Sequence, residues 1–175
     1  MHVRKIQAND GLLLKQLTLR SVEDAPHAFG GIQTLQEEQQ RPDSDWHQLA
    51  AECAGDIEEW RDRCIGYILM DDHASCGKAL VTLSRNTPPH AYMSAVWIDP
   101  IRRRRGGGRL LVQEACRWAK SKNADRLRLW VDDRNPEGRA FYQSLDFLPL
   151  NIHRPVSPGL ADLESAFEFT FNVTE

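Results

Sequence analysis

The feature that most constrains the fold is a run of arginines and glycines, residues 102–109, that joins an apolar segment to an amphipathic one. Residues 93–98 are apolar with β-branched side chains, which predicts a strand, whereas Leu111, Ala115 and Trp118 recur at helical spacing. A helix therefore begins on glycines. Its first backbone N–H groups have no internal partner and the helix dipole makes this end positive, so an anion is favoured there. The run predicts a strand–turn–helix unit that holds a phosphate.

The three consecutive glycines of this turn let a pyrophosphate approach the backbone closely, and successive N–H groups can form a concave anion site. Three glycines in a row can equally make only a flexible turn. The run is not a nucleotide-hydrolase phosphate loop, because no Gly-Lys-Ser/Thr follows, and it lacks the G-x-G-x-x-G spacing of dinucleotide sites. Phosphate binding here would depend on a different motif.

A second informative segment begins with residues 126–131, whose apolar and polar side chains alternate as in a strand. Asn135 then suits a helix N-cap, and Pro136 suits the first helical position. Phe141 and Leu145 fall on one face of the helix that starts there. The segment predicts a strand followed by a capped helix.

These two segments resemble the GCN5-related N-acetyltransferase (GNAT) family. The pattern R-x-x-G-x-G at residues 103–108 is similar to the acyl-CoA signature of that family. Asn135, Tyr142 and Phe147 are in register with its Asn-x-x-Ala-x-x-x-Tyr-x-x-x-Gly-Phe motif. The resemblance extends more loosely to the amino-terminal half, and its specific motifs lie within residues 97–147.

Two positions depart from the family motif. Gly138 stands where an alanine is usual, and glycine inside a helix costs about 1 kcal/mol relative to alanine. Asp146 stands where a glycine is usual, at a chain reversal that favours positive φ, which aspartate tolerates better than most residues. We therefore expect a loosened helix at the first position and a left-handed backbone at the second.

The resemblance implies an α/β fold in which one domain, residues 1–175, contains a mixed, mostly antiparallel sheet flanked by helices. It also implies an N-acetyltransferase that moves an acetyl group by direct transfer from acetyl-CoA to a primary amine of a small molecule or peptide. An acceptor of this kind is the expected partner. The identity of the amine cannot be read from the sequence, because acceptor loops vary while the donor site stays recognisable.

In the family, the pantetheine arm of acetyl-CoA lies along the strand before the glycine turn, in a splay between parallel strands, and the pyrophosphate lies at the turn. The cofactor-binding residues that the resemblance implies are Val96, Trp97, Ile98, Arg103, Arg104, Gly106, Gly107, Gly108, Arg109 and Asn135. For Val96 and Ile98 the functional groups are those of the backbone, since their side chains suit the core. Any one arginine can instead be solvated, and Asn135 can cap a helix, contact the cofactor, or do both.

Tyr142 is the expected catalytic residue. A phenol titrates near 10, so at neutral pH it can donate a proton to the departing coenzyme A thiolate. The alternative is a tyrosine that only packs on the apolar face beside Phe141 and Leu145. The register with Asn135 favours the acid.

The base that accepts the amine proton has no motif to mark it. Glu37, Glu38, Asp132 and Asp133 are the candidates, each with a surface carboxylate as its alternative. Side chains that could line the acceptor pocket are His27, Trp46, Trp60 and Trp97, with core burial the safer expectation for the three tryptophans.

Composition agrees with this reading. A chain of 175 residues and 20.0 kDa suits one compact domain, and its formal net charge of −3 does not favour nucleic acid. The four cysteines lack metal-site spacing, so no metal is expected. The sequence has no charged-then-apolar leader and no apolar run near the length of a membrane span, so we expect a cytoplasmic protein without membrane contact.

The periodicity predicts one long helix over 33–53 and, after three central strands, the crossover through the glycine turn. The full set of expected elements is strands near 2–7, 64–70, 77–84, 91–98, 126–131, 147–153 and 165–173 and helices near 10–23, 33–53, 107–121 and 136–145. The last strand, with Phe167, Phe169 and Phe171, could pair across a homodimer.

Two other function classes remain open. One is a catalytically weak module that binds or senses acyl-CoA, which measurable turnover with any amine would exclude. The other treats the arginine run as a nucleic-acid contact. It ranks last, because the run is short and the net charge is negative.

Overall fold

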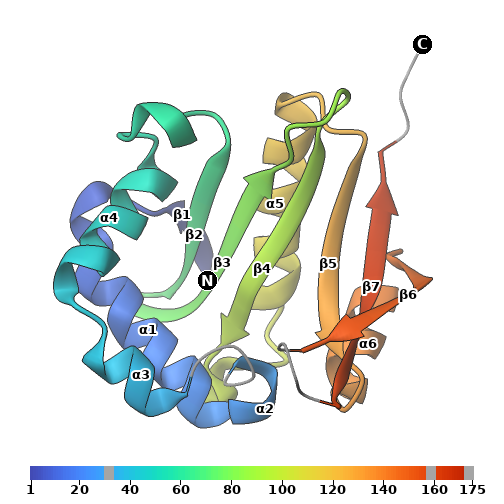
Figure 1. The fold of residues 1–175 in the computed structure, drawn as a ribbon. Coiled ribbons are helices and arrows are strands. Elements are labelled where there is room, and N and C mark those ends of the chain that lie inside the picture. Colours follow the sequence, from blue (N-terminus) through green and yellow to red (C-terminus); the bar gives the residue numbers. More distant parts are fainter. Residues whose placement is uncertain (30–33, 157–160, 172–175) are drawn as a thin grey trace.

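The computed structural model describes residues 1–29, 34–156 and 161–171, without the side chains of His27 and Phe29. Its centre is a seven-stranded sheet in the order β1-β2-β3-β4-β5-β7-β6 (Figure 1). The strands are β1 (His2–Lys5), β2 (Cys64–Asp71), β3 (Ala74–Leu83), β4 (His90–Ile98), β5 (Arg126–Asp132), β6 (Leu148–Pro155) and β7 (Leu163–Thr170). Only β4 and β5 pair in parallel, which confirms the expected mixed, mostly antiparallel sheet.

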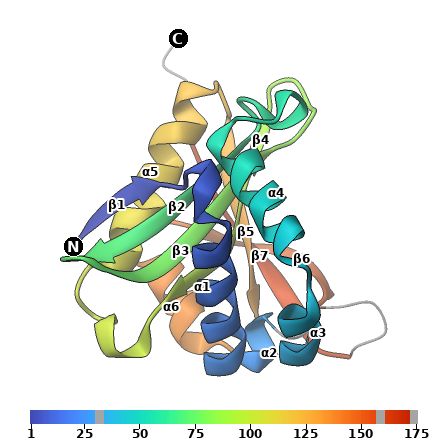
Figure 2. The same ribbon diagram turned by 90° about the vertical axis from the view of Figure 1, so that its left-hand side faces the viewer.

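Helices cover both faces of this sheet. They are α1 (Gly11–Asp24), α2 (Pro26–Phe29), α3 (Leu35–Gln40), α4 (Asp43–Ala54), α5 (Gly107–Ser121) and α6 (Pro136–Gln143). The first four lie on one side, and α5 and α6 lie on the other (Figures 1 and 2). Short 3-10 turns occur at Ala8–Asp10, Glu58–Trp60 and Pro100–Arg102. None of the helices in these described ranges has the length and apolar character needed to cross a bilayer.

Two apolar cores follow from this layering. The core under α5 and α6 includes Leu111, Leu129 and Phe147, and the core under α1 and α4 includes Leu17 and Trp46. Strand β2 contributes to both, because alternate side chains of a strand point to opposite faces. Its uninterrupted apolar sequence reflects burial on both sides.

The expected single helix over 33–53 is wrong. The structure has two helices there, α3 and α4, separated by Arg41 and Pro42. Arg41 is extended, with φ −60° and ψ 127°. Proline lacks the N–H that a helix interior needs and disfavours helical backbone at the preceding residue, so the chain turns at this point. Residue 33, the expected start, lies outside the described residues.

The prediction that the last strand is exposed and could pair across a homodimer is also wrong. Strand β7 lies between β5 and β6 and is hydrogen-bonded on both edges, so it has no free edge to offer. Phe167 and Phe171 are buried in the core under α5 and α6, and Phe169 packs against it. The sheet ends instead at β1 and β6. Residues 172 and 173 of the predicted strand lie outside the described part of the chain.

The segment from β4 through α5 to β5 places the site. Because β4 and β5 are parallel, their carboxyl ends lie at the same edge of the sheet. Ligands of open α/β sheets bind beyond the carboxyl ends of such strands. The glycine turn leaves β4 at this edge, and α6 begins shortly after β5 ends there.

Candidate active site

The two parallel strands separate at the point where the site is expected. Pairing between β4 and β5 is confined to three positions, from His90 opposite Arg126 to Tyr92 opposite Arg128. Beyond these the strands diverge (Figure 1). The edge of β4 that faces β5 is therefore outside the ladder from Met93 onward, as the splay predicted from the family requires.

A bulge in β4 adds to this opening. Ala95 has φ 53°, a left-handed value, and the register with β3 shifts beside it. Ala95 and Val96 have no partner in the register of either neighbouring strand. The Ile98 carbonyl, by contrast, accepts a hydrogen bond from Arg103 Nε at 3.0 Å. The backbone of Val96 is therefore more available to the cofactor arm than that of Ile98, whose carbonyl already accepts a hydrogen bond.

The turn after β4 prepares the start of α5. Asp99 accepts a hydrogen bond from the Ile101 backbone N–H at 3.1 Å, which fixes the exit from the strand. Arg104 and Gly106 then adopt left-handed backbone, with φ 61° and 85°. Gly106 is the N-cap of α5 and supplies no side-chain acceptor to the first N–H groups of the helix. Those groups remain the anion-binding feature that the sequence predicts.

The three glycines of the turn are needed for different structural reasons. A Cβ at Gly107 would lie 2.4 Å from Leu69 Cδ2, and one at Gly108 would lie 2.8 Å from Phe141 Cζ. These two glycines let α5 pack closely against the sheet and α6, so a larger residue at either would disturb the core. Only at Gly106 would a Cβ meet open space. The close approach expected of a ligand at Gly108 is thus accompanied by a packing requirement that the sequence did not indicate.

The arginines of the turn are largely held by carboxylates. Arg102 and Arg105 both pair with Asp71 at the end of β2. Arg103 pairs with Asp24 at the end of α1. These two carboxylates were missed by the sequence analysis, since each is far from the turn in sequence and carries no local signal. These contacts pair three of the four consecutive arginines with carboxylates, while Arg103 and Arg105 stay exposed.

Two of the predicted arginines, Arg104 and Arg109, are not held by Asp71 or Asp24. Arg104 is 83% exposed and lies 3.5 Å from Glu137 Oε1. Arg109 is exposed and pairs with no other described residue. A hollow of about 370 Å³ is lined by Met1, Asp71, Arg105, Gly106, Arg109 and Leu110. The structure therefore brings Gly106 and Arg109 together at one concave surface, while Arg103 points to Asp24.

Asn135 caps α6 as expected. Its Oδ1 accepts a hydrogen bond from the Gly138 N–H at 2.8 Å. A Cβ at Gly138 would lie 2.6 Å from Asn135 Nδ2, so the departure from alanine accommodates the cap. Asp146, beyond the end of the helix, has φ 65°, which confirms the predicted left-handed position.

Tyr142 projects from α6 into the core and is 8% exposed. Its ring makes edge contacts with Phe141 and Phe147, at centroid distances of 5.0 and 5.7 Å. Burial raises the pKa of the Tyr142 phenol well above its usual value, which keeps the hydroxyl protonated at neutral pH. The packing and acid interpretations are thus compatible in one residue.

The candidate bases occupy very different surroundings. Glu37 is exposed and forms a capping box with Thr34, whose backbone N–H it accepts at 2.7 Å. Asp132 is held by Arg134 at 2.7 Å, and Asp133 accepts from Ser165 Oγ and pairs with Arg139. Glu38 alone among the four is buried with an oxygen left unpartnered.

The aromatic candidates are mostly structural. Trp46 is buried under α4. Trp97 is buried on β4, and its Nε1–H donates to Asp24 Oδ2 at 2.9 Å. Trp60 is half-buried. Core burial therefore holds for two of the three tryptophans, and the side chain of His27 lies outside the described part of the chain.

Comparison with known proteins agrees with this geometry. Residues 22–147 match the acetyltransferase (GNAT) family model. A mycothiol acetyltransferase from Beutenbergia cavernae is 29% identical over 98 residues, which is 55% of this chain and 32% of that protein. The chain thus spans about a third of the length of that relative.

Solved structures show the same fold at low sequence identity. An acetyltransferase of the GNAT family from Streptococcus pneumoniae superposes with a TM-score of 0.77 at 16% identity, over 97% of this chain and 98% of that one. The PaiA N-acetyltransferase from Thermoplasma acidophilum, solved in complex with coenzyme A, gives 0.75 at 15% identity over the same shares. The resemblance read from residues 97–147 is confirmed, and the chain belongs to the acetyltransferase (GNAT) family.

Proposed function

We propose that this chain is an N-acetyltransferase that transfers an acetyl group from acetyl-CoA directly to a primary amine of a small molecule or peptide. Acetyl-CoA is the acyl donor of this family, in agreement with the expected cofactor. The observation that carries the proposal is the separation of β4 from β5 beyond Tyr92 and Arg128. It leaves strand backbone free beside the turn that begins α5.

The donor would be held at two places. The unpaired backbone at Val96 suits hydrogen bonds to the amide groups of a pantetheine arm. The first N–H groups of α5, with Gly106 and Arg109 beside them, suit the pyrophosphate. Arg103 and Arg104 would add electrostatic attraction, with Arg103 reaching the phosphate only if it leaves Asp24. Asn135 would contact the arm from the start of α6.

Chemistry would then follow from positioning and one proton transfer. Holding an amine against the thioester carbonyl converts a bimolecular step into an effectively unimolecular one, which contributes several kcal/mol. The amine nitrogen bonds to the carbonyl carbon, the carbon–sulfur bond breaks, and the thiolate takes the phenolic proton of Tyr142. Burial raises the pKa of the Tyr142 phenol and so keeps the hydroxyl protonated at neutral pH, as a proton donor to the thiolate must be.

The competing proposals differ in what they require. A nucleic-acid contact needs free cations, but Asp71 and Asp24 hold three of the four consecutive arginines. An acyl-CoA-sensing module needs only the donor site. We therefore keep the sensing module as the alternative. Separately, we expect the enzyme to act in the cytoplasm.

The test is a panel of amines incubated with acetyl-CoA and the protein. Aminoglycosides, polyamines, amino acids and peptides with free amino termini cover the acceptor classes. Mass spectrometry should show a product one acetyl group heavier than its acceptor, with stoichiometric release of free coenzyme A. Coenzyme A binding without transfer to any amine would instead support the sensing module.

A further inference from the structure

Glu38 is the buried polar group that the fold leaves least satisfied. Its side chain projects from α3 and is 5% exposed, yet its Oε2 has no hydrogen-bond partner. Within the described ranges, Trp46 Nε1 is the one other buried side-chain atom in this state. Burying a polar group without a partner costs free energy, and native proteins rarely do so without a reason. An unpaired carboxylate oxygen is a ready acceptor for a proton or a cationic ligand.

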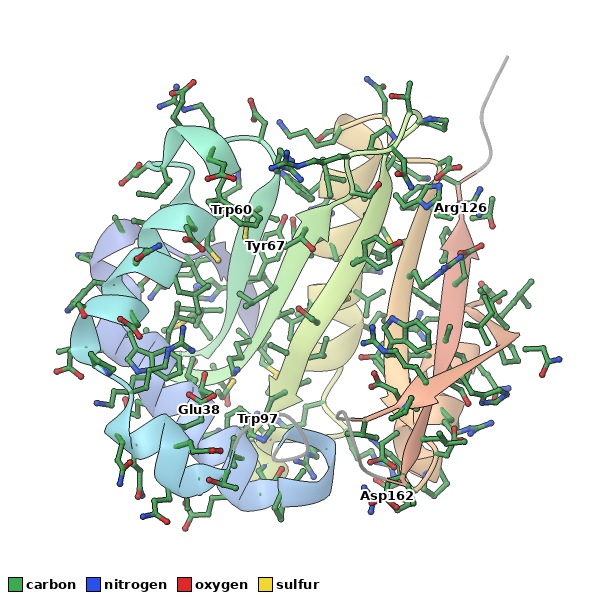
Figure 3. The ribbon with its side chains drawn as sticks, in the orientation of Figure 1. Glu38, Trp60, Tyr67, Trp97, Arg126 and Asp162 are labelled. Atoms are coloured by element: carbon green, nitrogen blue, oxygen red, sulfur yellow. The ribbon has the colours of Figure 1, made fainter. Side chains whose placement is uncertain are left out.

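The surroundings of Glu38 place it on the face of the sheet that α1 to α4 cover. Lys78 on β3 lies within electrostatic range of it and is itself buried. In the sheet register Lys78 lies opposite Trp97 of β4, next to Val96. Figure 3 shows Glu38 and Trp97 at the same end of the sheet, on the side covered by α1 to α4. Glu38 thus approaches the end of β4 from the face opposite α5 and α6.

The charged neighbours leave Oε2 available. Arg41 forms an ion pair with Oε2, but its Nη1 lies 3.9 Å away, which is beyond hydrogen-bond distance. Glu37, the adjacent acid on the same helix, is turned outward into its capping box. Burial raises the pKa of Glu38, while Arg41 and Lys78 act in the opposite direction. A carboxylate made more basic by burial suits a general base.

We propose that Glu38 accepts the proton that a neutral acceptor amine loses as it attacks the thioester, directly or through one water. This inference rests on the proposed function. As the nitrogen–carbon bond forms and the carbon–sulfur bond breaks, one amine proton passes to the Glu38 carboxylate while the phenolic proton of Tyr142 passes to sulfur. Solvent then restores the protonation of both groups, so atoms and charge balance.

The test compares Glu38→Gln with Glu37→Gln, two adjacent substitutions that remove one carboxylate each. With an acceptor identified from the amine panel, Glu38→Gln should lower kcat by about 100-fold and leave the KM for acetyl-CoA unchanged. The acidic limb of the pH–rate profile, which reports protonation of the base, should disappear. Glu37→Gln should stay within about twofold of the parent, because that side chain only caps a helix.

Three outcomes decide the matter. If Glu38→Gln folds and retains turnover within about twofold, Glu38 is a structural partner of Lys78 and the inference is overturned, while the proposed function stands. If Glu38→Gln does not fold, Glu38→Asp keeps the charge, and an unchanged acidic limb in that variant would overturn the inference, whereas a displaced limb supports it. If the parent binds coenzyme A but acetylates no amine, the proposed function itself fails.

Discussion

The donor side of this sheet and the face covered by α1 to α4, where we propose that the acceptor amine is deprotonated and which we call the acceptor side, are built in different ways. The donor side, from Val96 to Asn135, depends on backbone conformation: a strand separation, a left-handed glycine, a helix start and a capped helix. The acceptor side depends on side-chain pairs between distant segments, such as the hydrogen bond from Trp97 Nε1 to Asp24 across 73 positions. Short-range backbone features can be recognised in a sequence, whereas long-range pairs cannot. The same difference separates the two proposed catalytic groups. Tyr142 lies in a local motif, whereas only tertiary packing distinguishes Glu38 from Glu37.

The arginine run illustrates the contrast most sharply. In the sequence it is a local concentration of positive charge, but in the fold Asp71 and Asp24 form ion pairs with three of its members. The buried carboxylate of Asp71 holds two guanidinium groups, which fixes the shape of the turn and offsets part of its positive charge. The phosphate site should then depend on backbone N–H groups and Arg109 more than on the number of arginines.

Among the donor-side residues, the largest expected effect concerns the acid. Tyr142→Phe removes one hydroxyl and keeps the ring contacts with Phe141 and Phe147. General acid catalysis contributes about 100- to 10,000-fold, so we expect the acetylation rate to fall by at least tenfold with little change in coenzyme A affinity. Single-turnover kinetics with an acceptor for which chemistry limits turnover would measure this.

Tyr67→Phe is the matched control for that variant. Tyr67 is also buried with a raised pKa, and its hydroxyl donates to the Glu114 carbonyl at 3.3 Å. Its loss should cost about 1 kcal/mol of stability and leave the rate unchanged. If Tyr142→Phe behaves in the same way, with turnover within about twofold of the parent, Tyr142 is a core residue and the proton comes from elsewhere.

A smaller effect should follow from straining the turn at Gly106. Valine at this left-handed position costs on the order of 1–2 kcal/mol, and a Cβ there meets no neighbour, so the strain falls on the turn alone. Gly106→Val should therefore weaken coenzyme A binding by about tenfold, as measured by calorimetry, because the N–H groups of α5 lose their alignment.

Gly55 offers the comparison for Gly106. It ends α4 with φ 84°, close to the 85° of Gly106, and a Cβ there also meets open space. Gly55→Val should lose a similar amount of stability without changing coenzyme A affinity. Equal binding by the two variants would show that the turn is only a connection between β4 and α5.

The smallest expected effect is that of the surface cation. Arg109→Gln should weaken coenzyme A binding about fivefold, because an exposed charge contact is worth on the order of 1 kcal/mol. The loss should shrink as salt is added. Arg117→Gln removes an equal charge further along α5, where the arginine pairs with Glu114, and should have no effect on binding. Similar losses in both variants would mean that only net charge matters.

Sequence reasoning succeeded where one short segment decides the structure. The helix start at Gly107, the cap at Asn135 and the left-handed Asp146 each depend on a few neighbouring residues. The break at Pro42 was readable in principle from the proline, but the helical periodicity on either side outweighed it.

The remaining features depend on tertiary contacts. Strand β7 has no free edge because it lies between β5 and β6 in the sheet, and no local pattern encodes this position. The packing requirement at Gly108 arises from Phe141 on another helix. Glu37 and Glu38 were indistinguishable as neighbouring acids in a polar helix. Only the tertiary packing of α3, which contacts α1, makes one a cap and the other a buried carboxylate.

Thermal unfolding of the parent protein with and without coenzyme A tests the donor site most directly. A ligand that binds only the folded state adds about 2.7 kcal/mol at 100 times its dissociation constant, so the melting temperature should rise with coenzyme A concentration. The rise should be present in both low and moderate salt and be reduced by Gly106→Val but not by Gly55→Val. No rise at millimolar coenzyme A in either salt would contradict the assignment of the turn and the strand separation as the donor site.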